Sequence, residues 1–265
     1  MLGTNAPTVS VIIPAKDPKP EDLYQAISSA LSQSVRTEVL VIDDGSNPPI
    51  RFFHPRVKIH RRSKSGGPAV SRNLGLKLAS GKFVAFLDSD DWWSSNFLSS
   101  STVYLNKNPQ LVGTLALSHK IIELGFSFSG YIKILTFNLL RDCLVLISYF
   151  TNNKQLKRET PILSQISHML FRKSKINAIK FDTSYKYCED MKFVFQSQTS
   201  GQIGIIPRRL VWFRYSSGSN TFTQFRKNND KPLYYHRLLS EIKNSCSPSL
   251  YLKTFEFYIN HLLIK

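Results

Sequence analysis

The sequence predicts an α/β fold in which a mostly parallel sheet carries helices on both faces, followed by a C-terminal helical extension. Three observations predict it. Segments of strand character alternate with segments of helical apolar spacing across residues 8–107, which is typical of parallel sheets with right-handed connections. Two of these strands end abruptly in aspartates, at the edge where open α/β sheets bind ligands. Two amphipathic segments, 232–244 and 249–264, predict the terminal helices.

The elements of the first half follow from local signals. The first strand is predicted at 8–13, because its residues are largely β-branched and apolar and Pro14 stops it. A polar loop leads to a helix that opens near Glu21, where negative charge suits the helix dipole. The second strand, 38–42, runs into an acidic turn in which Gly45 permits a tight bend. The predicted elements that follow are a strand at 57–60, a helix after the loop 66–68, a strand at 83–87 and a helix at 96–107.

The strand at 83–87 carries the strongest chemical signal, because Asp88, Asp90 and Asp91 follow it directly. Like charges this close repel each other, so their grouping needs a reason. A hard divalent cation such as Mg²⁺ or Mn²⁺, bridging to substrate phosphates, is one reason. An ordinary turn in which an aspartate caps the next helix is the alternative.

The second half of the chain is less regular. Residues 111–124 predict one or two strands, whereas the apolar stretch 127–149 permits no assignment. The remaining predicted elements are a strand at 167–171, a helical turn at 173–179, a helix beginning near Asp190, and short strands at 202–207 and 210–215.

Composition limits the partners and the compartment. A formal net charge of +17 indicates an anionic partner, but the basic residues form no dense tract, so we expect no nucleic-acid binding. The three cysteines are far apart and predict buried free thiols in a reducing compartment. The most apolar window, 131–150, contains Lys133, Arg141 and Asp142 and predicts no membrane span. We expect a cytoplasmic protein, with peripheral contact at the anionic inner face of the plasma membrane left open.

Five landmarks occur in a fixed order: VSVIIPA at 9–15, VIDDGS at 41–46, GGPAVSRNLGL at 66–76, FLDSDDWW at 86–93 and CED at 188–190. With these landmarks the chain resembles the family 2 glycosyltransferases, strongly over 8–107 and more thinly over 165–220. The resemblance implies the Rossmann-like GT-A fold. It also implies a nucleotide-sugar-binding half at 8–107, an acceptor-binding and catalytic-base half at 108–224, and the helical extension at 225–265.

The resemblance further implies a function and its residues. The expected reaction is an inverting transfer of a sugar from a nucleoside-diphosphate sugar to a hydroxyl of a cell-surface glycan or lipid-linked precursor. The general base is expected at Asp190, and a Mn²⁺ or Mg²⁺ ion is expected on Asp91 and Asp90. The residues expected to bind the nucleotide sugar are Pro14, Ala15, Asp43, Asp44, Arg72, Asp88 and Asp90.

Some features depart from the family or stay open. Lys16 stands where relatives often have an aromatic residue or Asn near the base, which leaves the base unassigned, and Ser216 stands where many have a histidine. A catalytically silent sugar-nucleotide-binding scaffold is one alternative. A nucleotidyltransferase is another, although only Lys16 follows the first strand in place of a glycine-rich phosphate loop. Packing of the C-terminal helices on the core is favoured over homodimerisation or membrane contact, and Trp92 and Trp93 are expected to be mostly structural.

Overall fold

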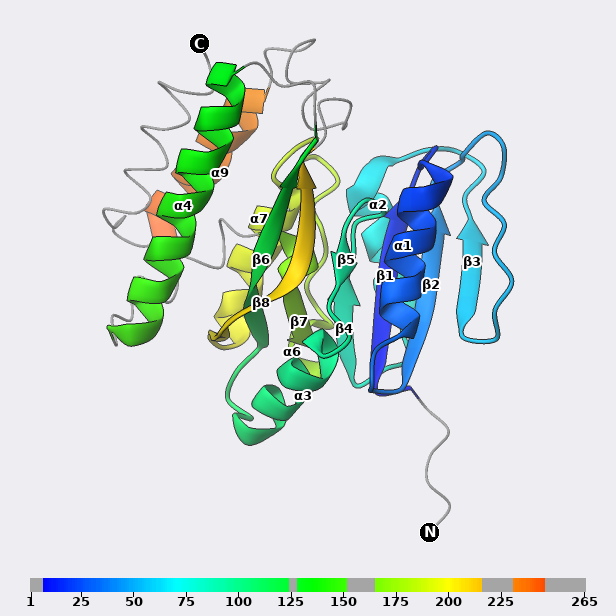
Figure 1. The fold of residues 1–265 in the computed structure, drawn as a ribbon, viewed down its shortest axis with the longest axis horizontal. Coiled ribbons are helices and arrows are strands. Elements are labelled where there is room, and N and C mark those ends of the chain that lie inside the picture. Colours follow the sequence, from blue (N-terminus) through cyan, green and yellow to red (C-terminus); the bar gives the residue numbers. More distant parts are fainter. Residues whose placement is uncertain (1–6, 124–127, 152–164, 216–230, 246–265) are drawn as a thin grey trace.

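A computed structural model describes residues 7–123, 128–151, 165–215 and 231–245 of the chain (Figure 1). The strands are β1 (Val9–Ala15), β2 (Thr37–Asp43), β3 (Val57–Arg61), β4 (Phe83–Phe86), β5 (Trp92–Trp93), β6 (Gly113–Ile122), β7 (Met169–Arg172) and β8 (Ile203–Tyr215). The α-helices are α1 (Pro20–Leu31), α2 (Gly67–Leu78), α3 (Phe97–Lys107), α4 (Phe128–Phe150), α6 (Lys173–Ile176), α7 (Glu189–Ser197) and α9 (Lys231–Ser245), and two short 3-10 turns are η1 (Ile166–His168) and η2 (Gln198–Ser200).

One sheet runs through both halves of the chain in the order β3-β2-β1-β4-β7-β6-β8-β5. Strands β3, β2, β1 and β4 are parallel neighbours, as the alternating pattern of the first half predicts. Strand β7 then pairs antiparallel with both β4 and β6, while β6 and β8 are again parallel. Figure 1 shows β1, β2 and β3 on one side of the molecule and β6 and β8 on the other, with α4 beyond β6 and remote from β3.

Alternating residues of the central strands supply two separate cores, one on each face of the sheet. Val11 and Ile13 of β1 face a core that includes α1 and α3. Ile12, between them, faces a core that includes α2, α7 and α9. Because both faces are covered by helices, the central strands are mostly apolar, and 83–87 is a continuous apolar run.

The second half differs from the sequence-based expectation in several places. The unassigned stretch 127–149 is one long helix, α4. The strands predicted at 202–207 and 210–215 are a single strand, β8, and the ladder between β8 and β6 is irregular beside Pro207. The prediction that all the cysteines are buried is wrong for Cys143, which lies exposed on α4; Cys188 is buried and both are free thiols.

Helix α9 confirms the first of the two predicted C-terminal helices and packs on the core. Leu238, Leu239 and Ile242 are almost fully buried in the same core as α2 and α7. The second predicted helix, 249–264, lies outside the described residues. Within the described parts of the chain no helix, α4 included, is long and apolar enough to cross a membrane.

Candidate functional site

Three parallel strands bring the residues of the candidate site to one edge of the sheet. Ala15 of β1 lies opposite Asp43 of β2, and Ile12 lies opposite Phe86 of β4. The backbone amide of Asp44 donates to the carbonyl of Ala15 over 2.8 Å, and Pro14 is level with Ile42. The residues that follow β1, β2 and β4 therefore share the carboxyl edge, where parallel sheets bind ligands.

Asp43 is fully buried and holds the turn that follows β2. Its carboxylate accepts hydrogen bonds from the amides of Ser46 (2.8 Å) and Ile50 (3.3 Å) and pairs with Arg61 over 2.7 Å. Burial alone would raise the pKa of Asp43, but these hydrogen bonds outweigh it and lower the pKa. The side chain is therefore an ionised brace between β2, β3 and the turn.

Asp44 anchors the start of α2. It pairs with Arg62 and accepts from Ser65 Oγ (2.7 Å) and from the amides of Gly66 (3.0 Å) and Gly67 (2.8 Å). Gly67 has a φ of +84°, which a side chain at this position would strain. Asp44 therefore fixes the loop that leads into the helix carrying Arg72.

Arg72 joins the two halves of the chain. Its guanidinium donates to Asp88 Oδ1 and to Glu189 Oε1, each at 2.8 Å, and the Glu189 bond spans 117 residues of sequence. The side chain is only 5% exposed and lies over the ring of Phe181. Although burial opposes it, the charges of Asp88, Glu189 and Asp190 raise the pKa of Arg72 above its ordinary value. The arginine is therefore always charged, and it fixes the end of β4 against the start of α7.

The start of α7 places two acidic residues beside this arginine. Burial, and then the charge of Asp190, raise the pKa of Glu189 to about 7, against the attraction of Arg72. Burial also raises the pKa of Asp190, although Arg72 and the amide of Met191 act in the opposite direction. The helix dipole alone favours the ionised form of Asp190, so desolvation is the larger effect here. Cys188, which precedes the pair, has a left-handed φ of 64°, the kind of strained conformation that gathers at functional sites.

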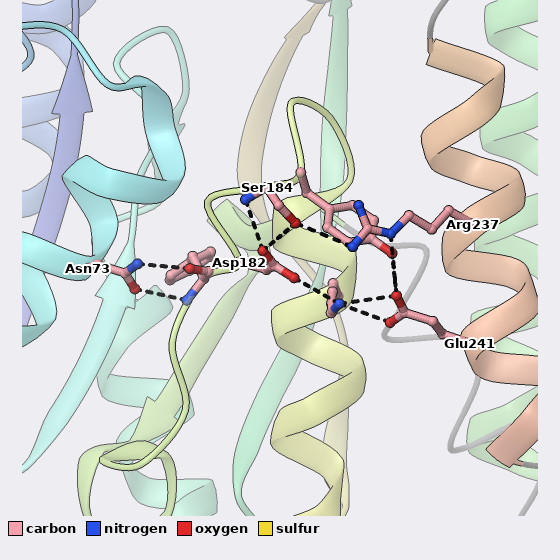
Figure 2. A network of polar contacts seen from close by, with 8 residues as sticks. Asn73, Asp182, Ser184, Arg237 and Glu241 are labelled. Carbon is pink, nitrogen blue, oxygen red and sulfur yellow. Dashed lines mark hydrogen bonds and ion pairs between the residues drawn. The ribbon is translucent and has the colours of Figure 1, made fainter.

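A polar network fixes this start of α7 to the rest of the molecule (Figure 2). Asn73 of α2 makes two hydrogen bonds of 2.8 Å with the backbone of Phe181. Lys192 of α7 pairs with Asp182 (2.9 Å) and with Glu241 of α9 (3.0 Å). Helix α9 therefore helps to position the segment that carries Glu189 and Asp190.

The aspartates after β4 form a crowded acidic group. Asp91 is 1% exposed, and its Oδ2 atom has no hydrogen-bond partner. Burial, followed by the charges of Asp90 and Asp88, raises the pKa of Asp91 well above its ordinary value. Burial and the charge of Asp88 likewise raise the pKa of Asp90 to about 6. An unpaired buried carboxylate oxygen among like charges fits a cation.

Arg214, near the end of β8, partly neutralises this group. Its backbone amide donates to Asp91 Oδ1 (3.2 Å), and its guanidinium pairs with Glu123 (2.8 Å) and Asp22 (3.3 Å). The guanidinium also lies over the Trp92 ring, 5.1 Å from its centroid. Strand β8 is thereby fixed to the acidic turn after β4.

A metal at this position would need ligands from outside the protein. In the described parts of the chain no three His, Cys, Asp or Glu side chains are grouped so that they could hold a metal ion by themselves. Asp91 and Asp90 could supply two of the oxygen ligands that Mg²⁺ or Mn²⁺ prefers, and phosphate or water oxygens could complete the shell.

The two tryptophans after the acidic group occupy different environments. Trp93 is buried, and its indole nitrogen donates to the carbonyl of Ser167 over 2.8 Å. Trp92 is partly exposed and stacks on Trp212 of β8, which in turn stacks on His119 of β6. One ring is therefore structural, while the other belongs to a partly exposed aromatic stack beside the acidic group.

Sequence reasoning placed Asp88, Arg72 and Asp190 in one site, and the structure brings all three together. It did not identify Glu189 as the partner of Arg72, or the pairs of Asp43 with Arg61 and Asp44 with Arg62. A buried arginine requires anionic partners, and the Glu189-Asp190 pair at a helix start was the one local signal for them.

Comparisons with known proteins find relatives of this chain in sequence and in fold. The sequence model of the family described as "Glycosyl transferase family 2" matches residues 10–176. An uncharacterized glycosyltransferase of Rickettsia conorii is 30% identical over 271 residues, covering 98% of this chain and 40% of that protein. The Escherichia coli protein WfgD, a UDP-Glc:alpha-D-GlcNAc-diphosphoundecaprenol beta-1,3-glucosyltransferase, is 39% identical over 106 residues, or 38% of this chain and 42% of its own length. The chain thus spans less than half the length of these two relatives.

Two solved structures have the same fold. S. aureus TarS in complex with UDP-GlcNAc superposes with a TM-score of 0.65 at 19% identity, over 91% of this chain and 68% of that chain. The mannosyltransferase PcManGT of Pyrobaculum calidifontis, in complex with GDP-Man and Mn²⁺, gives 0.64 at 14% identity, over 98% of this chain and 70% of that chain. These glycosyltransferase neighbours confirm the predicted fold class.

The bridging role of Arg72 can be tested by Arg72→Met. We expect a loss of about 3–5 kcal/mol in the free energy of unfolding at pH 8, because two carboxylates lose their common cation. The loss should be smaller at pH 5, because Glu189 is protonated below its pKa of about 7. Urea unfolding at both pH values measures it, with Lys77→Met, an exposed residue of the same helix, as the control. An equal loss at both pH values would contradict the bridge.

Proposed function

Because the chain belongs to glycosyl transferase family 2, we propose that it transfers a sugar from a nucleoside-diphosphate sugar to a hydroxyl group of a cell-surface glycan or lipid-linked precursor. One observation carries the proposal. The carboxyl edge of the sheet holds an acidic group with an unpartnered buried carboxylate oxygen, Asp91 Oδ2, and the start of α7 brings a second, partly buried carboxylate, Asp190, near Arg72. Transfer of a sugar from a nucleoside diphosphate requires a cation that stabilises the leaving diphosphate and a base that takes the proton of the attacking hydroxyl.

The donor is proposed to bind along the ends of β1, β2 and β4. In this proposal Pro14 and Ala15 line the nucleotide site, and Asp43 and Asp44 shape its base-binding loops from their ionised, hydrogen-bonded positions. Neighbouring structures contain UDP-GlcNAc or GDP-Man, which supports a nucleoside-diphosphate sugar as the donor class. Arg72 and Asp88 lie farther along the same edge, where the ribose and the sugar of the bound donor are proposed to lie.

Asp91 and Asp90 are proposed to hold Mn²⁺ or Mg²⁺. A bound divalent ion stabilises the negative charge that grows on a diphosphate leaving group. The protein's part is to present the buried Asp91 beside the partly exposed Asp90 and to hold β8 against Asp91 through the amide of Arg214. The Mn²⁺ complex of PcManGT supports this choice of ion class.

Asp190 is proposed as the general base. It would take the proton of the acceptor hydroxyl while that oxygen attacks the anomeric carbon and the nucleoside diphosphate departs. One base and one displacement invert the anomeric configuration. Burial raises the pKa of Asp190, which makes it a better proton acceptor in its ionised form. The amide of Met191 donates to its carboxylate, and the charge of Arg72 acts on it from nearby.

The outer face of α4 is proposed to contact the membrane that carries a lipid-linked acceptor. Among the described residues, nine of the twelve exposed large hydrophobic side chains lie on this helix, including Phe128, Leu139 and Phe150. Its polar residues Asn138 and Arg141 are buried instead. A helix that is apolar outside and polar inside suits a lipid boundary, and the net charge of +17 suits an anionic surface.

The donor and the metal can be tested by thermal stabilisation with UDP, GDP, dTDP or ADP, each with and without Mn²⁺. At about 100 times its dissociation constant, a ligand stabilises by roughly 2.7 kcal/mol. We expect one diphosphate to stabilise only with Mn²⁺, and Asp91→Asn to remove that dependence, while the exposed Glu21→Gln does not. Mn²⁺ affinity should rise as the pH rises through about 6, because Asp90 must lose its proton. A metal-dependent shift that survives in Asp91→Asn would contradict the metal assignment.

The base can be tested by Asp190→Asn. We expect the rate of sugar transfer to fall by about 10²–10⁴-fold, because an asparagine cannot take up the proton of the attacking hydroxyl group. Transfer of labelled glucose from UDP-glucose to a diphospholipid-linked N-acetylglucosamine is a suitable probe reaction, in keeping with the relative WfgD. Nucleotide affinity should be unchanged, and an equal collapse of nucleotide affinity would show that Asp190 serves donor binding instead.

Membrane contact through α4 can be tested by Leu139→Glu, which places a charge at a position 68% exposed on the apolar face. We expect co-sedimentation with vesicles containing phosphatidylglycerol to fall several-fold, because a carboxylate resists burial at the lipid boundary. Tyr24→Glu is the matched control, at a position 64% exposed on α1. Equal vesicle binding by both variants and the wild type would exclude α4 as the contact.

A further inference from the structure

A second group of polar side chains lies between β6, β8 and α4, with some members buried and Arg209 at its exposed margin. It consists of Lys120 of β6, Arg141 and Asp142 of α4, His168 of η1 and Arg209 of β8, here called the inner basic cluster. Arg141 is 2% and His168 1% exposed. The apolar core and the acidic group after β4 do not account for cationic side chains at this position. Cations removed from water need anionic partners, so the partner of these cations must be sought separately.

The ring of Phe213 is the centre around which the cluster gathers. Lys120 is level with Phe213 across the β6–β8 ladder, and its Nζ lies 5.2 Å from the ring centroid. The His168 ring is 6.1 Å from the same ring, nearly perpendicular to it. Tyr215 follows on the same face of β8, and its hydroxyl donates to Asn138 of α4 over 3.0 Å. These side chains therefore lie close together between the strands and α4.

Positive charge exceeds negative charge in this space. Asp142 is shared by Arg141 (2.8 Å) and Arg209 (3.0 Å). Lys120 has no carboxylate within ion-pair distance among the described residues, and its Nζ is bonded to the hydroxyl of Ser118. His168 Nε2 is buried without any hydrogen-bond partner. A partly buried ammonium with only a hydroxyl partner, beside an unpartnered buried imidazole nitrogen, suits the binding of an anion.

The electrostatics agree with this geometry. Burial, and next the charge of Arg141, lower the pKa of Lys120 well below its ordinary value. Burial, followed by the charges of Lys120 and Arg141, lowers the pKa of His168 in the same way. Both groups therefore lie in a positive field that a bound anion would relieve.

The cluster is adjacent to the proposed active site. His168 follows Ser167, whose Oγ accepts a hydrogen bond from the amide of Asp88 over 3.1 Å. On β8, Arg214 stands between Phe213 and Tyr215, and its amide donates to Asp91. The side chains of Phe213 and Tyr215 point to the opposite face of the strand from that of Arg214. The cluster therefore lies behind the acidic group, on the side of α4.

We propose that the inner basic cluster binds the phosphate or diphosphate group of the acceptor, with Lys120 as the principal cation. This inference rests on the proposed function, since it names the anionic part of that reaction's acceptor. Helix α4 supports it from both sides: its inner face supplies Arg141 to the cluster, and its outer face is apolar. A lipid-linked diphosphate acceptor has the same arrangement of charge and hydrocarbon. Its diphosphate, next to the sugar, would meet the inner face of α4, and its hydrocarbon chain would extend toward the bilayer on the outer face.

The test is isothermal titration with farnesyl diphosphate, inorganic pyrophosphate and farnesol, in the presence of saturating UDP and Mn²⁺. We expect both diphosphates to bind the wild type and farnesol not to bind. Lys120→Met should weaken diphosphate binding at least about tenfold, because a charge-assisted contact is lost. Lys120→Arg should retain binding, and Lys77→Met, which removes an exposed charge on α2, should leave it unchanged. UDP-Mn²⁺ stabilisation of each variant shows whether the donor site and the fold persist.

Each outcome decides the proposal. Binding of pyrophosphate and farnesyl diphosphate with equal affinity would assign the site to the phosphate group alone, and tighter binding of the prenyl compound would add the lipid chain. If Lys120→Met loses both the stabilisation by UDP-Mn²⁺ and the binding of diphosphate, Lys120 serves the donor site and the proposal is overturned. Undiminished diphosphate binding in Lys120→Met would overturn it as well. If none of UDP, GDP, dTDP and ADP stabilises the wild type with Mn²⁺ while the two diphosphate probes still bind, the proposed function fails and the anion site stands.

Discussion

The buried guanidinium of Arg72 is the interaction on which the rest of the site depends. It holds the end of β4 through Asp88 and the start of α7 through Glu189, two segments that are remote in sequence. Apolar packing alone does not fix such a junction, because hydrophobic contacts have no direction. A planar donor with two carboxylate partners does fix it, at the cost of removing three charges from water. The aromatic group of Phe181, Phe193 and Phe86 beside it supplies the burial that offsets this cost.

The same constraint explains why so many carboxylates can gather at one sheet edge. Asp43 and Asp44 are neutralised within the fold by Arg61 and Arg62, and hydrogen bonds lower the pKa of each. Asp90 and Asp91 have no comparable cation, and their pKa values rise. The fold thus supplies ion-pair and hydrogen-bond partners to the acidic residues that build its loops. It supplies fewer partners to the acidic residues that would meet a ligand. This difference separates the acids that brace the fold from those proposed to bind the metal more clearly than their spacing in the sequence does.

The first half of the fold was predictable because its signals are local. Strands such as 38–42 and 83–87 are short apolar runs between polar turns, and the aspartates mark their carboxyl ends. The second half was not predicted correctly at two places. At these places the rule that an apolar stripe marks the buried face of a helix fails, and so does the rule that proline ends a strand. Helix α4 turns Asn138, Arg141 and Asp142 inward, so an apolar stripe does not mark its core-facing side. Pro207 normally ends a strand, but in β8 it falls where the ladder with β6 skips residues, and the strand continues. The partners of Arg72 and Asp44 could not be predicted, because they depend on long-range contacts.

The inverted polarity of α4 has a consequence for the whole molecule. An apolar outer face costs free energy in water, and buried charges cost more, so neither would persist without a compensating environment. On the inner side Asp142 satisfies two arginines, yet Lys120 keeps only a hydroxyl partner. Both deficits, the exposed apolar face and the unmatched cation, are removed by one kind of molecule: an amphiphile with an anionic group next to its hydrocarbon. In the proposed reaction the acidic edge of the sheet binds a divalent cation together with the donor's phosphates, and the inner basic cluster binds the acceptor's phosphates. The two sides of this half-sheet are thus suited to the two different substrates of a single transfer reaction.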